Sequence, residues 1–118
     1  MATTVLSGTS GALYYKPAGT TGTFGESDVN TGSDTVTVAP YLNFKVGDPV
    51  QFSVVNSQTG GSGSGTLPAG ISPSTTYYVI AYTASTGVLQ VSATLGGSTI
   101  TITDDGTAAA PNEFQVAY

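Results

Sequence analysis

The chain has neither cysteine nor histidine among its 118 residues. Without cysteine it can form no disulfide bond and supply no thiolate to a metal. Without histidine it lacks the side chain that most often acts as a general base near neutral pH and binds transition metals. Any catalysis would have to rest on carboxylates.

Seven carboxylates are present, and all fall in predicted turns or at strand edges, where aspartate commonly caps a turn: Glu26, Asp28, Asp34, Asp48, Asp104, Asp105 and Glu113. The adjacent pair Asp104-Asp105 lacks the spaced oxygen ligands of a dedicated calcium loop. We therefore predict that the protein is not an enzyme and has no cofactor and no metal site.

Basic residues are almost as scarce, since Lys16 and Lys45 are the only two and the net charge is −5. A chain with so few cations cannot neutralise a phosphate backbone or bind an anionic membrane surface. No apolar run approaches the length of about 18 residues that marks a membrane span, and the first residues lack the pattern of a secretion signal. We expect no direct nucleic-acid partner, no membrane, and a protein made in the cytoplasm that reaches its place by assembly.

Good helix formers are rare, whereas glycine, threonine and valine are abundant, which favours strands joined by tight turns. Thr35–Val38 shows the clearest alternation, with both valines on one face. Six strands are predicted between residues 34 and 118: 35–38, 50–55, 76–82, 88–92, 99–103 and 113–118. The fold class is all-β, a compact antiparallel sandwich or small barrel, and local patterns do not distinguish these two architectures.

Residues 1–33 are rich in glycine, serine and threonine, and contain two isolated apolar islands. Such a segment offers little surface to bury. We predict an extended N-terminal arm at 1–33 and a β domain at 34–118. The expected anchors of the arm on a coat or sister subunit are Val5, Leu6, Leu13, Tyr14 and Tyr15.

The predicted strand 76–82 is the most aromatic. A period of two places Tyr78, Ile80 and Tyr82 on one face, opposite Tyr77, Val79 and Ala81. With two apolar faces, the strand is either central in the sheet or part of a subunit contact, so Tyr77, Tyr78 and Tyr82 are candidate contact residues. Tyrosines also stack on sugars, but packing is the simpler role for residues on a strand.

The stretch from Val46 to Gly106 resembles a module of small virion proteins of tailed bacteriophages, above all capsid decoration (cement) proteins. The similar features are an entry turn, a Leu-Pro-x-Gly corner, a Tyr-Tyr-Val strand and a strand pair ending in Asp-Gly: 46–50, 67–71, 76–80, 89–94 and 96–106. The segment 11–19 is also similar to the starts of some tail-tube subunits.

The resemblance implies a structural virion protein that stabilises a phage head by bridging major capsid subunits. The expected location is the outer capsid surface, and the expected partners are the major capsid protein and further copies of the chain, as a dimer or trimer. The alternatives are a tail-tube, tail-tip or fibre component, or a glycan-binding module. A tube subunit usually has a helix, and no helical pattern of useful length is present.

Overall fold

The computed structural model describes residues 21–55, 65–108 and 114–118. Apart from a single turn of 3-10 helix, η1 (Glu26–Asp28), its regular elements are strands, so the all-β prediction is confirmed. The strands are β1 (Thr21–Phe24), β2 (Val29–Asn30), β3 (Thr35–Thr37), β4 (Pro49–Val54), β5 (Gly65–Thr66), β6 (Tyr77–Thr83), β7 (Val88–Ser92), β8 (Thr107–Ala108) and β9 (Phe114–Ala117).

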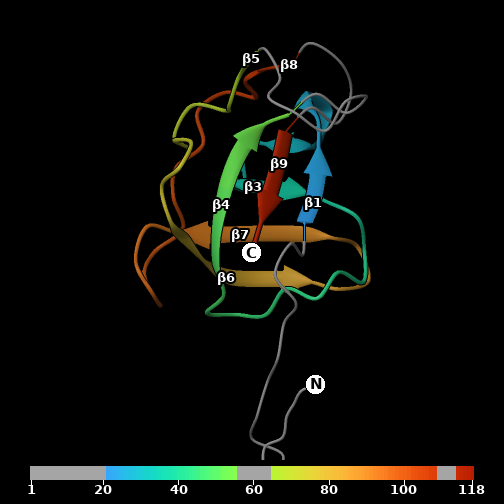
Figure 1. Ribbon diagram of the computed structural model, residues 1–118, viewed down its shortest axis with the longest axis vertical. Helices are drawn as coiled ribbons and strands as arrows, with labels where there is room; N and C mark the ends of the chain where they lie inside the picture. The colour runs from blue at the N-terminus through green and yellow to red at the C-terminus, as the bar shows by residue number, and fades with distance from the viewer. Residues whose placement is uncertain (1–20, 56–64, 109–113) are drawn as a thin grey trace, which may run out of the picture.

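Seven of these strands form one antiparallel sheet in the order β1-β9-β4-β6-β7-β3-β2, while β5 and β8 pair separately. Strand β4 connects the two parts of the sheet: Pro49 and Val50 pair with β6, and Gln51 to Val54 pair with β9. Figure 1 shows β4, β9 and β1 running across the direction of β6 and β7. The sheet therefore folds over on itself and encloses a core between its two parts.

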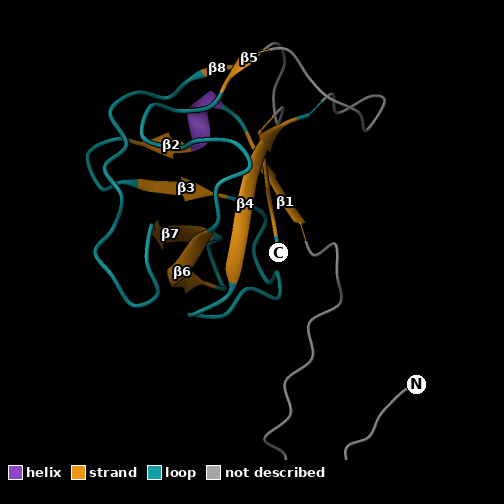
Figure 2. Ribbon diagram, turned by 60° about the vertical axis from the view of Figure 1, so that its left-hand side comes forward, coloured by secondary structure: helices purple, strands orange, loops and turns teal. Residues whose placement is uncertain are grey.

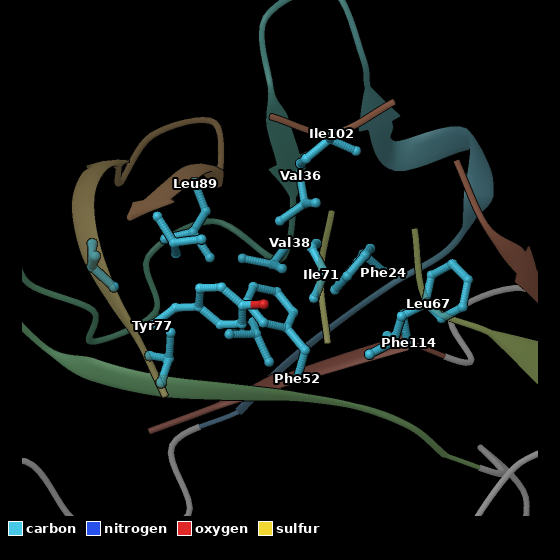
Figure 3. Packing of buried hydrophobic residues seen from close by; sticks show 14 of the residues in the cluster. Phe24, Val36, Val38, Phe52, Leu67, Ile71, Tyr77, Leu89, Ile102 and Phe114 are labelled. Carbon is cyan, nitrogen blue, oxygen red and sulfur yellow. The ribbon is translucent and has the colours of Figure 1, made fainter. Parts of the chain in front are cut away.

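Three phenylalanines mark the centre of the core, which Figure 3 shows from close by. The ring of Phe24 lies 6.1 Å from that of Phe52, edge to face, and 5.3 Å from that of Phe114. Each of the three comes from a different strand of the β1-β9-β4 part, and each is fully buried. Aromatic pairs in these arrangements add to the free energy gained from burial alone.

The strands with strict alternation form as predicted. In β3 and β4, Val36, Val50 and Phe52 are buried, together with Val38 just after β3. The predicted strands 76–82 and 88–92 form as β6 and β7, which pair as a hairpin, and the last predicted strand forms as β9. The alternation decides which side chains enter the core, because a shift by one residue would expose all of them.

A β-bulge in β6 corrects the prediction for Tyr82. The register shifts between Val79 and Ala81, so that Tyr82 pairs with the buried Leu89 of β7. The extra residue of a bulge reverses the alternation beyond it. Tyr82 therefore lies on the same face as Tyr77 and Val79, against the core, and not on the face of Tyr78.

The predicted arm is also corrected, at its C-terminal end. Thr21–Phe24 is strand β1, paired with β9, and Val29–Asn30 is β2, paired with β3. Gly22 lies so close to Val38 that a Cβ atom built on the glycine would be 2.9 Å from the Cβ of Val38. The described part of the 1–33 segment therefore belongs to the body. The prediction was wrong here because it used the average composition of the segment, which is poor in apolar residues, whereas the single residue Phe24 is buried in the core.

The predicted strand 99–103 does not form. Thr99 makes an isolated bridge to Ser92, and the segment beyond it is held by separate hydrogen bonds. The amide of Ile102 donates to the carboxylate of Asp34 at 2.9 Å, and the amide of Thr103 donates to the carbonyl of Ala69 at 3.0 Å. The alternation of apolar and polar residues in 99–103 still places one side chain in the core, since Ile102 is buried.

The turn after β6 ends at Gly87, which has φ +83 and lies directly against the backbone of Val38. Gly87→Ala should destabilise the protein strongly, because a Cβ would overlap the carbonyl oxygen of Val38 and because φ is left-handed. Gly96→Ala is the matched control: Gly96 has φ +69, but a Cβ there meets nothing within 4 Å. Chemical denaturation should show a clearly larger loss for Gly87→Ala, and equal losses would contradict the close contact.

Candidate interaction surface

Five of the predicted contact residues, Val5, Leu6, Leu13, Tyr14 and Tyr15, lie outside the described residues. What the structure does describe is the point where their segment joins the body. Thr21 pairs with Ala117, at the end of β9, and β1 is the last strand of the sheet on that side. The segment therefore joins the body at Thr21, beside Ala117.

Tyr77 is not available for a contact with a partner, which corrects its place among the contact residues. It is 4% exposed and its ring meets that of Phe52 edge to face at 5.7 Å. Its hydroxyl accepts a hydrogen bond from the amide of Ser72 at 2.8 Å. The residue fills the core and satisfies its own polar atom there, as buried tyrosines usually do.

Tyr82 is likewise engaged within the chain. Its hydroxyl accepts a hydrogen bond from the amide of Leu42 at 3.0 Å and donates one to the carbonyl of Ala39 at 2.8 Å. Its ring packs against Phe44 at 5.7 Å. Tyr82 thus fastens the segment between β3 and β4 to the sheet, while Tyr78, opposite Pro49 on the outer face of β4, is half-buried.

The outer face of β1, β9 and β4 carries no charged side chain in its two central rows. One row is Thr21, Ala117 and Gln51, and the other is Thr23, Gln115 and Ser53. Their neighbours along each strand point inward, as the buried Phe24, Phe52 and Val116 show. Figure 2 shows this part of the sheet on one side of the molecule, with β3, β7 and β6 on the other. In a chain of net charge −5, this is a polar and uncharged surface.

A shallow groove of about 280 Å³ lies beside this face, lined by Pro49, Val50, Gln51, Thr76, Ala117 and Tyr118. The side-chain amide of Gln51 donates to the hydroxyl of Thr76 at 3.2 Å. The ring of Pro49 and that of Tyr118, which is 40% exposed, supply apolar surface. Sequence reasoning missed the groove because its lining comes from three segments far apart in the chain, and none of them carries a motif.

Among the described residues, three other large apolar side chains are exposed, and none was predicted as a contact residue: Tyr41 at 77%, Val46 at 70% and Leu95 at 68%. Val46 and Leu95 each precede a glycine with positive φ in a hydrogen-bonded turn. A Cβ built on Gly47 would lie 3.8 Å from Leu95, so the two turns are in contact. The positive φ of these glycines accounts for the turn geometry.

Asp104 holds the Leu-Pro-Ala-Gly corner in place. Its carboxylate accepts hydrogen bonds from the amides of Ala69 at 3.0 Å and Gly106 at 2.8 Å. Both bonds lower the pKa of Asp104, and the bond from Ala69 has the largest effect. Desolvation raises the pKa by a smaller amount. Among residues 21–55, 65–108 and 114–118, no group of three or more acidic side chains is placed to hold a metal ion.

Asp104→Asn should lower the melting temperature at neutral pH, because the amide side chain is a weaker acceptor for two backbone amides. The pKa of Asp104 is lower in the folded than in the unfolded protein, where it is near 3.8. The ionised carboxylate therefore stabilises the fold above the unfolded pKa, and this stabilisation is lost as the pH falls through the folded pKa. The difference in melting temperature between wild type and variant should therefore shrink on acidification. Asp105→Asn is the matched control, and a similar loss in that variant would contradict the specific role of Asp104.

A scan against protein-family models found no match, and searches of the curated proteins and of the solved structures found none either. Within the described parts of the chain, no helix is long and apolar enough to cross a membrane.

Proposed function

We propose that the protein is a capsid decoration protein of a tailed bacteriophage, which stabilises the head by bridging subunits of the major capsid protein. It has no catalytic role and binds no cofactor or nucleic acid. It is made in the host cytoplasm and added to the outer surface of the shell as a dimer or trimer. The similarity of Val46–Gly106 to small virion proteins supports this proposal.

One observation carries the proposal: the described residues by themselves supply a core of fifteen buried apolar side chains. The core cluster of described residues runs from Phe24 to Val116, and no buried side-chain nitrogen or oxygen in the described parts lacks a partner. Val5, Leu6, Leu13, Tyr14 and Tyr15 precede this core in the sequence. Isolated apolar side chains in a segment rich in glycine and threonine are suited to burial against another protein.

The surface of the body is suited to a permanent neighbour. The outer face of β1, β9 and β4 consists of threonine, glutamine, serine and alanine, which can approach another protein without desolvating a charge. The low number of bases also suits a protein on the outside of a shell that contains DNA.

The glycan-binding alternative loses support from the positions of the tyrosines. Tyr77 and Tyr82 use their rings and hydroxyls within the fold, so neither offers a free platform for stacking on a sugar. The tail-tube, tail-tip and fibre alternatives remain open, and the position of the protein in the particle separates them from decoration.

Binding to emptied heads of the phage that encodes the chain tests the proposal. Full-length protein should sediment with heads and saturate, whereas a Leu13→Ser/Tyr14→Ser/Tyr15→Ser variant should bind at least about tenfold more weakly, because hot-spot aromatic and aliphatic anchors dominate such contacts. A Thr3→Ser/Thr4→Ser/Thr9→Ser variant, which changes the same segment but no apolar residue, is the control. Absence of saturable binding by the full chain would overturn the proposal.

A further inference from the structure

The groove lined by Pro49, Gln51, Thr76 and Tyr118 has the chemistry of a tyrosine-binding site. The rings of Pro49 and Tyr118 offer apolar surface, and the amide of Gln51 with the hydroxyl of Thr76 offers polar partners for a phenol. No lining side chain is charged. At about 280 Å³, the groove lies just below the range of drug-sized ligand pockets, and its size suits a side chain more than a free ligand.

The chain itself supplies side chains that match the chemistry of this groove. Tyr14 and Tyr15 lie a few residues upstream of Thr21, which pairs with the groove residue Ala117. We propose that the groove of one copy receives Tyr14 or Tyr15 of a second copy, so that the N-terminal segments link neighbouring molecules. This inference rests on the proposed function, because it assigns the contact between copies on the shell.

The second copy is favoured over the same chain by the sequence between the tyrosines and β1. Pro17 restricts the residue before it to extended geometry, and Tyr15 lies six positions before Thr21 in the sequence. An extended segment of that length spans about 20 Å. Because β1 is antiparallel to β9, Thr21 lies beside the end of β9. An extended segment before Thr21 would lead away from the groove of its own chain and toward a neighbouring molecule.

A contact of one aromatic side chain is small, so free molecules should associate weakly. Copies held side by side on a shell have a high effective concentration, which strengthens each such link without any new contact. A head-to-tail arrangement of this kind also closes into rings when the rotation between neighbours permits, in agreement with the proposed dimer or trimer.

Sedimentation velocity across a wide range of concentrations tests the inference without any capsid. The full chain should self-associate reversibly, and Tyr14→Ser/Tyr15→Ser and Thr76→Arg should each weaken association at least about tenfold, the first by removing the occupant and the second by filling the groove. Thr83→Arg, at an exposed position near the other end of β6, is the control and should associate as wild type does. Thermal melts should show all three variants folded.

A mixture of the two deficient variants gives the sharper result. Thr76→Arg keeps its tyrosines and Tyr14→Ser/Tyr15→Ser keeps its groove, so the mixture should associate although neither variant does alone. A full chain that stays monomeric, or a Thr76→Arg variant that associates normally, would overturn the inference. If the chain is monomeric but Tyr14→Ser/Tyr15→Ser shifts the NMR signals of Thr76 and Ala117, the occupant is the same chain. Binding to heads, measured separately, shows whether the proposed function itself fails.

Discussion

Replacing Phe24 with alanine should lower the free energy of unfolding by about 3–5 kcal/mol, the cost of removing a buried aromatic ring and leaving a cavity. Phe24 is fully buried between Phe52 and Phe114. Since a domain of this kind is stable by about 5–15 kcal/mol in total, the variant should unfold at far lower denaturant or not fold at all. Urea denaturation followed by circular dichroism measures the change.

The control for this prediction is Thr23→Ala on the same strand. Thr23 is exposed and faces outward, so its loss should alter stability by no more than about 0.5 kcal/mol. Equal effects of the two substitutions would show that β1 does not contribute to the core, and the arm would then extend to residue 33 as its composition alone predicts.

Two N-terminal deletions should differ sharply in their effect. Deleting residues 2–20 should leave a cooperatively unfolding β protein, because the described core begins at Phe24. Deleting residues 2–30 removes β1, η1 and β2, exposes one edge of β9 and takes Phe24 from the core. That protein should be largely unfolded.

Circular dichroism and a thermal melt of both deletion proteins decide this prediction. The shorter deletion should also bind emptied heads far more weakly than the full chain, since it lacks Leu13, Tyr14 and Tyr15. An unfolded 2–20 deletion would place the first residues in the core, and a folded protein that binds heads normally would place attachment on the body.

Alternation of apolar and polar residues made much of the fold predictable. The clear runs at Val36, at Val50 to Val54 and at Phe114 to Val116 specify half-buried strands wherever they pair. The Leu-Pro-Ala-Gly corner was also recognisable, because its sequence places a glycine where such a turn requires a positive φ. Gly70 has a positive φ in the structure. These signals are local, so they need no knowledge of strand order.

The features that the sequence did not predict depend on pairing between distant segments. The bulge in β6 arises from its register with β7 and moves Tyr82 to the inner face. Residues 99–103 alternate as a strand does, yet they are bonded to Asp34 and Ala69 in place of a neighbouring strand. The groove likewise exists only because β4, β9 and the start of β6 lie together.

The position of the protein in the particle tests the account most directly. Under the proposed function, cryo-electron microscopy of the virion should show the β body of this chain as separate density on the outer surface of the head, at contacts between major capsid subunits. The body in that density should match residues 21–55, 65–108 and 114–118, with β1 in the sheet. Density forming a ring within the tail, or located only on a fibre, would contradict the assignment as a decoration protein.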